Sequence, residues 1–175
     1  MQAITALVYI TLFTSSALSF AAAPALKVTK NVTIDAPAAA VWSKAKDFGS
    51  LNTWHPAVDT DQIVEGKDNK VGAVRLLTLK GGGTIREKLL GYSDSGKTFK
   101  YSIVEGVLPV SDYTSTFTVK AAGKNKSEVT WVGEFKRKNT GENPGDKEND
   151  KTATDTIAGV YQAGLDNLKK VVEGK

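Results

Sequence analysis

The segment Thr84–Tyr92 carries a glutamate in a position where burial is costly. Apolar and charged residues alternate along this segment, so Ile85, Glu87 and Leu89 share one face of an extended strand. Because Ile85 and Leu89 should face the interior, the Glu87 carboxylate is carried inward with them. A buried carboxylate needs a charged or hydrogen-bonding partner, or else its pKa rises.

Arg75, one predicted strand earlier, is the expected partner of Glu87. It shares a strand face with Leu77 and Leu79, although the alternate face of that strand is also apolar. On a cavity wall, the pair would offer a polar contact to a ligand. A purely structural ion pair explains the same residues equally well, so both interpretations stay open.

The single histidine, His55, lies in the motif Trp54-His55-Pro56. A neutral imidazole can act as a general base near neutral pH. The chain has no cysteine and no second histidine, so nothing supports a histidine-based nucleophilic triad, a thiolate nucleophile or a zinc site of several histidines. A packing role for His55 is the simpler interpretation, and we assign no catalytic residue, metal or cofactor.

The first 21 residues are predicted to be a secretory signal peptide. Residues 3–18 carry no charge, and small residues follow up to Pro24. An uncleaved membrane anchor would need about 20 apolar residues, and this stretch is shorter. Cleavage after Ala21 would leave one domain, residues 22–175, in the periplasm or outside the cell, with no membrane span. The formal net charge of +4 is mild and interspersed, which does not favour a nucleic-acid partner.

The remaining pattern predicts a strand, two short helices, six strands and a long helix. The first strand is expected at Val28–Ile34. A short helix is expected to begin with Pro37 at its first helical position and to end at Gly49, and a second one is expected at Leu51–His55. Short turns separate the six later strands, which implies antiparallel neighbours. These strands are expected at Val58–Glu65, Ala73–Leu79, Thr84–Tyr92, Thr98–Glu105, Asp112–Ala121 and Ser127–Lys138.

The last segment, Lys151–Val172, is predicted to be one amphipathic helix, because apolar residues recur in it at three- and four-residue spacing. Gly164 falls on the apolar stripe, where it allows either close helix–sheet packing or room for a ligand. The expected fold is α+β of the helix-grip kind, with a curved antiparallel sheet of about seven strands around the long C-terminal helix. One helix covers such a sheet only partly, so a cavity is expected between them.

The element order and several motifs resemble the START/Bet v 1-like superfamily, also called SRPBCC or polyketide cyclase-like. The matching motifs are Ile34-Asp35-Ala36-Pro37, Trp54-His55-Pro56, Val71-Gly72-Ala73-Val74-Arg75, Glu87-Lys88-Leu89 and Trp131 in the last strand. The resemblance implies an apolar cavity. It does not fix the function, since members range from lipid carriers and hormone receptors to polyketide cyclases.

The resemblance also implies positions for further site residues. Tyr101, Tyr113 and Tyr161 are expected on the cavity wall with Arg75 and Glu87, although tyrosines of the core, bonded to backbone carbonyls, are the alternative. Glu134 matches a carboxylate position that lines the cavity in plant hormone receptors, although Trp131 and Phe135 have the opposite parity in this strand. The residues expected at the cavity rim are Trp54, His55 and Leu108.

An exported protein of this size also resembles the MxaD-type accessory proteins of methanol-oxidising bacteria. The expected function is therefore a non-enzymatic one. The protein would hold a small amphipathic or hydrophobic ligand, or dock on a periplasmic dehydrogenase or cytochrome of methanol oxidation. The alternative is an enzyme of the cyclase or hydratase type with Glu87, Tyr113 and His55 as acid–base groups.

Overall fold

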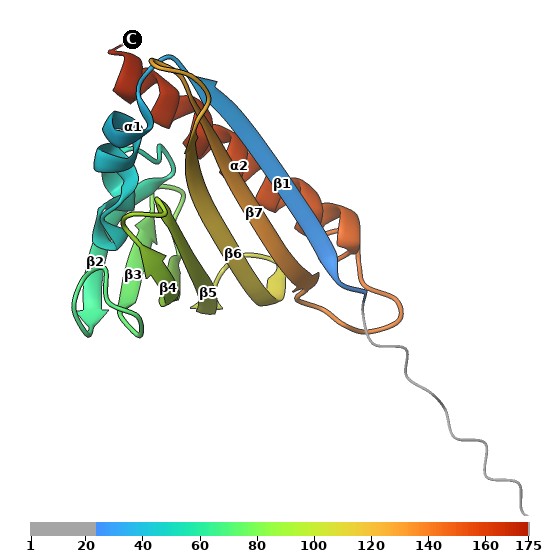
Figure 1. The fold of residues 1–175 in the computed structure, drawn as a ribbon. Helices are drawn as coiled ribbons and strands as arrows, with labels where there is room; N and C mark the ends of the chain where they lie inside the picture. The colour runs from blue at the N-terminus through green and yellow to red at the C-terminus, as the bar shows by residue number, and fades with distance from the viewer. Residues whose placement is uncertain (1–23, 175) are drawn as a thin grey trace, which may run out of the picture.

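The computed structural model describes residues 24–174, so the predicted signal peptide lies outside the described residues. One antiparallel sheet and one long helix make up most of this part of the chain (Figure 1). The strands are β1 (Leu26–Ile34), β2 (Val58–Glu65), β3 (Val74–Leu79), β4 (Thr84–Ser93), β5 (Thr98–Gly106), β6 (Val110–Ala121) and β7 (Ser127–Arg137). The helices are α1 (Ala38–Ala45), the 3₁₀ helix η1 (Phe48–Thr53) and α2 (Asp150–Glu173).

The seven strands lie in the order β1-β7-β6-β5-β4-β3-β2. Strands that follow one another in the chain therefore pair with one another, except that β1 lies beside β7. The element order confirms the predicted α+β helix-grip fold, with its two short helices after the first strand. Within residues 24–174, no helix combines the length and the apolar character needed to cross a membrane.

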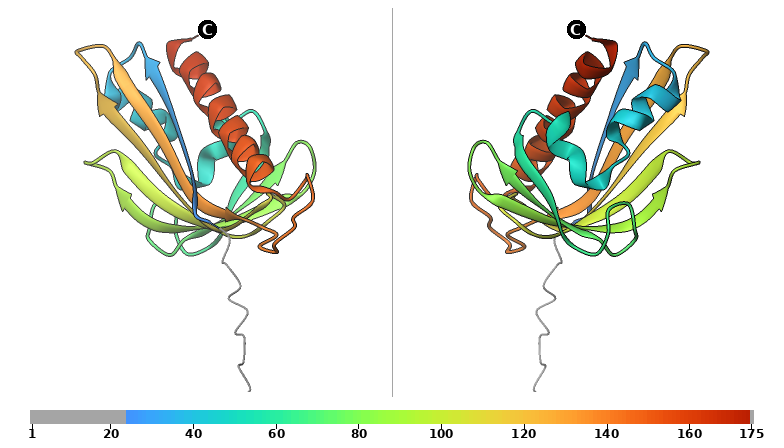
Figure 2. Two further views of the ribbon diagram at one scale, coloured as in Figure 1. Left: turned by 90° about the vertical axis from the view of Figure 1, so that its right-hand side faces the viewer. Right: turned by 90° about the vertical axis from the view of Figure 1, so that its left-hand side faces the viewer.

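The long helix α2 lies in the concavity of the curved sheet (Figure 2). Its first turn is capped by Asn149, whose side chain accepts a hydrogen bond from the backbone N–H of Thr152. Gly174 ends it in the left-handed conformation, with φ of 70°, that favours glycine. The buried stripe of α2 consists of Ala153, Ile157, Tyr161, Gly164, Leu165 and Leu168.

Two irregular pairings decide which side chains face α2. In β2, a register shift between Val58 and Thr60 places Asp61 opposite the buried Leu77 of β3, so Asp61 lies on the inner face. In β6, a second shift surrounds Asp112, whose φ of 49° is left-handed, and directs Tyr113 inward. Strict alternation along either strand would assign these faces incorrectly.

Candidate functional site

A small cavity lies between the inner face of the sheet and α2, with a volume of about 70 Å³. Aliphatic side chains form most of its wall, including Leu77, Ile85 and Ile157. Its polar lining residues are His55, Glu87, Tyr101, Tyr113 and Tyr161. An apolar cavity of about 150 Å³ holds a benzene molecule. A cavity half that size therefore suits a ligand of only a few heavy atoms.

Aromatic rings keep the cavity small by filling the space beside it. The Trp54 ring lies with its centroid 5.7 Å from those of both Phe117 and Trp131. Trp131 in turn stacks on Tyr161 at 4.5 Å. Trp54 is only 2% exposed and does not line the cavity, so its expected place at the rim is corrected. The chain turns inward after η1 and buries this indole in the core.

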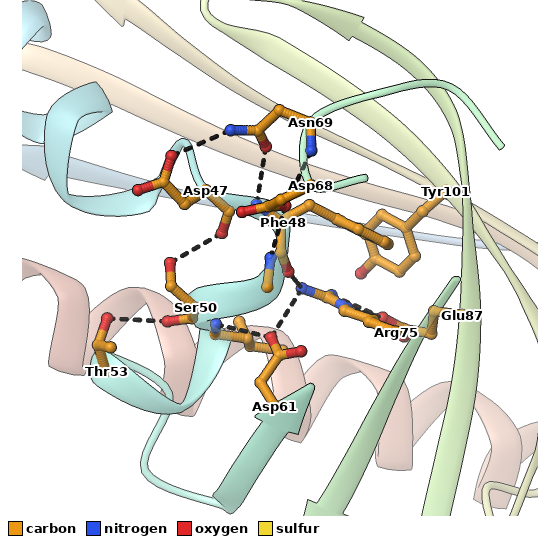
Figure 3. Close-up of polar contacts among 12 residues, drawn as sticks. Asp47, Phe48, Ser50, Thr53, Asp61, Asp68, Asn69, Arg75, Glu87 and Tyr101 are labelled. Carbon is orange, nitrogen blue, oxygen red and sulfur yellow. Dashed lines mark hydrogen bonds and ion pairs between the residues drawn. The ribbon is translucent and has the colours of Figure 1, made fainter. Parts of the chain in front are cut away.

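The most strongly charged feature of the interior is a triad of Arg75, Glu87 and Asp61 (Figure 3). The Nε and Nη2 atoms of Arg75 lie 2.7 and 2.6 Å from the same oxygen of Glu87, Oε2. Nη1 lies 3.4 Å from Oδ2 of Asp61 and donates to the carbonyl oxygen of Phe48 at 2.5 Å. Arg75 lies behind Glu87 and does not itself line the cavity, so its expected position on the wall is corrected to a supporting one.

Burial sets the protonation of the triad. Burial raises the pKa of Glu87, and the neighbouring guanidinium of Arg75 offsets this only in part. Burial likewise raises the pKa of Asp61, again opposed by Arg75. Burial alone would lower the pKa of Arg75, but the two carboxylates outweigh it and raise that pKa, so Arg75 stays charged. Because both carboxyls share one guanidinium, they titrate as a coupled unit.

The triad also belongs to a set of contacts that hold η1 over the sheet (Figure 3). Asp61 accepts a hydrogen bond from the backbone N–H of Leu51 at 2.9 Å. In the β2–β3 connection, Asn69 accepts from Phe48 N–H at 2.9 Å and Asp68 accepts from Gly49 N–H at 3.0 Å. The backbone of η1 is therefore fixed by side chains from β2 and from the segment before β3.

Three hydroxyl groups near the cavity form a neutral network. The phenol oxygens of Tyr113 and Tyr161 lie 2.5 Å apart, and Ser115 Oγ lies 2.8 Å from that of Tyr161. Trp131 Nε1 donates to the hydroxyl of Tyr101 at 3.0 Å. Burial raises the pKa of Tyr101 to about 12 and holds the pKa values of Tyr113 and Tyr161 well above their usual range. These phenols therefore remain protonated at neutral pH.

His55 lines the cavity, but both of its ring nitrogens are bonded to backbone groups. Nδ1 accepts from the N–H of Ala57 at 3.2 Å, so the proton is on Nε2, which donates to the carbonyl oxygen of Val160 at 3.0 Å. Burial lowers the pKa of His55 below its usual range, which keeps the ring neutral. These bonds support the packing interpretation, since neither nitrogen is available to a substrate.

The ring of His55 also explains why position 164 carries a glycine. A Cβ at position 164 would lie 2.6 Å from Cδ2 of His55 and 2.9 Å from the Trp131 ring. The absent side chain therefore allows close packing of α2 against these rings. The space is already filled, so it is not room for a ligand.

Glu134 lies on the outer face of the sheet, so its expected place on the cavity wall is wrong. Its side chain is 62% exposed and pairs with Lys27 of β1 at 3.0 Å. The neighbours Trp131 and Phe135 are buried on the inner face, and strand alternation then directs Glu134 outward. Leu108, expected at the rim, does line the cavity and is half-buried.

Sequence reasoning did not single out Asp61 or Ser115 as site residues. The signal for Ser115 was present, because it shares the inward face of its strand with Tyr113. No sequence pattern marked Asp61, because the register shift in β2 reverses the expected parity.

A larger groove of about 660 Å³ opens where β5 and β6 separate. Their pairing ends at Ser102 and Thr114, and beyond these residues the two strands diverge. Tyr113 lines both this groove and the inner cavity, so its side chain forms part of the wall between them. The groove is open to solvent, whereas the inner cavity brings polar side chains from several strands and α2 together.

The chain matches one protein family and several solved structures. A family model described as polyketide cyclase / dehydrase and lipid transport matches residues 25–173. The solved structure of protein XoxI from Bacillus cereus is 30% identical with a TM-score of 0.74, over 84% of this chain and 95% of that one. An uncharacterized protein from Bacillus thuringiensis is also 30% identical with a TM-score of 0.74, over 85% and 99% of the two chains. The structure of Ara h 8.0201 is 18% identical with a TM-score of 0.67, over 87% and 100%, and shares the fold alone.

Proposed function

The chain belongs to the polyketide cyclase/dehydrase and lipid transport family of the SRPBCC superfamily, and from this premise we propose that it is a non-enzymatic receptor for a small amphipathic molecule. The observation that carries the proposal is the cavity between the sheet and α2, with its aliphatic wall and polar side chains. Leu77, Ile85 and Ile157 would hold the apolar part of the ligand. Glu87 and the phenols of Tyr101 and Tyr113 would orient its polar group.

The state of the polar groups supports binding over catalysis. A general base needs an accessible atom with a pKa near the working pH. The backbone occupies both nitrogens of His55, and the buried phenols of Tyr113 and Tyr161 have pKa values far above neutrality. The alternative, an enzyme of the cyclase or hydratase type, therefore loses His55 and would depend on Glu87 and Tyr113 alone.

An NMR titration with n-propanol, a neutral amphipathic probe of suitable size, tests the proposal. Amide shifts should change at residues around the cavity and saturate. Leu79 lines the cavity and is half-buried, so Leu79→Phe should fill the space and abolish saturable binding. Leu90→Phe is the matched control, since Leu90 is 40% exposed on the outer face. If both variants bind the probe like the wild-type protein, the cavity is not the binding site.

We further propose that the domain works outside the cytoplasm, periplasmic or secreted, as an accessory to a dehydrogenase or cytochrome of methanol oxidation. The uncharged residues 3–18, the net charge of +4 and the resemblance to MxaD-type proteins support this role. The intact mass from the native host should then correspond to a chain that begins near Ala22. Association with an acidic partner should weaken as salt rises, because exposed charges are screened over about 8 Å at physiological ionic strength. Full-length protein in the membrane fraction, or a low-salt pull-down without dehydrogenase or cytochrome, would contradict it.

A further inference from the structure

Two carboxyl groups beside the cavity share one guanidinium. Glu87 faces it from β4, supported by Arg75 of β3, whose guanidinium also contacts Asp61 of β2. The other titratable groups around Glu87 are His55 and the phenols of β5, β6 and α2, and all of these are neutral at pH 7. One guanidinium faces two carboxyl groups, so Glu87 shares its counter-ion with Asp61.

Glu87 offers the cavity an oxygen that Arg75 does not use. Both contacts from Arg75, from Nε and from Nη2, go to Oε2. Among residues 24–174, no donor bonds to the other carboxylate oxygen, Oε1. Glu87 is 5% exposed and lines the cavity, so the accessible part of its carboxylate faces the cavity. A buried carboxylate oxygen of this kind favours a ligand that brings a hydrogen-bond donor with positive charge.

The rings around Glu87 have the chemistry that attracts cations. Tyr101, Tyr113, Trp131 and Tyr161 all line the same cavity as Glu87. The faces of such rings attract ammonium and guanidinium groups within about 6 Å of the ring centroid. The ring of Tyr101 already has such a contact with Arg75, whose guanidinium carbon lies 5.3 Å from the ring centroid.

The geometry points to a small alkylammonium ion as the ligand, with its cationic group against Glu87 among these rings and its alkyl part against Leu77, Ile85 and Ile157. This assignment rests on the proposed receptor function and specifies its ligand class. A carboxylate ligand would be repelled by Glu87. A neutral alcohol would form an ordinary hydrogen bond without the charge assistance.

Three probes of similar size test the assignment: n-propylammonium, n-propanol and propionate, each titrated by NMR at pH 7. In the wild-type protein, n-propylammonium should bind about tenfold more tightly than n-propanol, the difference between a charge-assisted and a neutral hydrogen bond. Propionate should not bind in the cavity. Glu87→Gln should remove the preference for the ammonium ion, whereas Glu134→Gln, the same change on the outer face, should keep it.

Because Glu87→Gln leaves Arg75 buried without its main partner, a second variant removes all three charges at once. This neutral triple variant is Asp61→Asn/Arg75→Met/Glu87→Gln. If it is folded by circular dichroism, it should bind n-propylammonium no more tightly than n-propanol.

The outcomes separate the ligand class from the receptor function. If n-propanol binds as tightly as n-propylammonium in the wild-type protein, the ammonium assignment is overturned and the receptor function stands. If the preference persists in the neutral triple variant, Glu87 is not its source and the assignment also fails. If no probe binds in the cavity, the receptor function and the assignment fall together.

Discussion

The two faces of the same sheet carry ion pairs of similar geometry in opposite surroundings. On the inner face, Arg75 and Glu87 join β3 to β4 at 2.6 Å, with side chains 2% and 6% exposed. On the outer face, Lys27 and Glu134 join β1 to β7 at 3.0 Å, with both side chains 62% exposed. The N···O distances alone would suggest that the two ion pairs contribute equally to stability.

The pKa values of the two glutamates move in opposite directions. Burial raises the pKa of Glu87, despite Arg75, because the charged form has lost its water. The hydrogen bond from Lys27 lowers the pKa of Glu134, whose charge remains hydrated. Burial, more than distance, therefore decides how strongly an ion pair affects stability. The inner pair is sensitive to the loss of either partner, whereas the outer pair is screened by solvent.

The largest effect should come from breaking the inner pair. Glu87→Gln and Arg75→Met should each reduce the free energy of unfolding by about 3–5 kcal/mol. Glu87→Gln removes one of the two carboxyl groups that pair with Arg75, and Arg75→Met leaves both carboxyl groups without a counter-charge. The neutral triple variant should recover much of that loss, since no buried charge remains. Urea denaturation measures the free energy of unfolding of all three variants. A triple variant less stable than either single variant would show that the charges themselves stabilise the fold.

A second contrast uses two glycines of α2. Gly164→Ala should cost about 1–3 kcal/mol, because the new Cβ would overlap the His55 and Trp131 rings. Gly159 is exposed, and a Cβ added there would have no neighbouring atom within 4 Å, so Gly159→Ala should instead stabilise the helix by up to about 1 kcal/mol. Thermal unfolding measures both, and equal shifts of Tm would contradict the tight packing of α2 on the inner face.

The pH dependence of stability should have opposite signs on the two faces. The raised pKa values of Glu87 and Asp61 mean that the folded state holds protons more tightly than the unfolded state. Their contribution is therefore fully present below the usual carboxyl pKa of about 4 and is lost as pH rises through the raised values. The neutral triple variant should lose this decline in urea-denaturation curves above about pH 4.

Glu134 should behave in the opposite way. Because its pKa is lowered in the folded state, its contribution is present above the usual carboxyl pKa and is lost as pH falls through the lowered value. Glu134→Gln should therefore flatten the stability profile slightly between the lowered pKa and the usual carboxyl pKa of about 4, and leave the decline at higher pH intact. If Glu134→Gln abolished the loss of stability at higher pH, the groups responsible for that loss would lie on the outer face.

The smallest effect should come from the outer pair itself at neutral pH. Lys27→Ala should leave Tm within experimental scatter, because the pair is solvated and screened by salt. Thermal unfolding in low and high salt checks this. A clear loss of Tm that disappears in high salt would show that the outer face depends on this pair.

The fold was predictable because local patterns agreed with it. Alternation in β4 placed Ile85, Glu87 and Leu89 on one face, and the structure buries all three. The spacing of apolar residues indicated α2 to within one residue at each end. Arg75 was the expected partner of Glu87, and the two do form an ion pair. Each of these predictions rested on a regular repeat along one element.

The errors in the site came from features that such repeats do not encode. Glu134 was placed by family resemblance against the parity of Trp131, and the parity prevailed. Asp61 escaped notice because a register shift between two strands is a property of their pairing. Trp54 was assigned to the rim, whereas its burial depends on the inward turn of the chain after η1.

Intermolecular nuclear Overhauser effects from bound n-propylammonium show which face of the sheet the ligand touches. We expect contacts from the ligand's methyl protons to the side chains of Ile85 and Ile157, which line the inner cavity. Contacts only to Leu90 and Val104, which are 40% and 60% exposed, would place the ligand outside the cavity and contradict binding at Glu87.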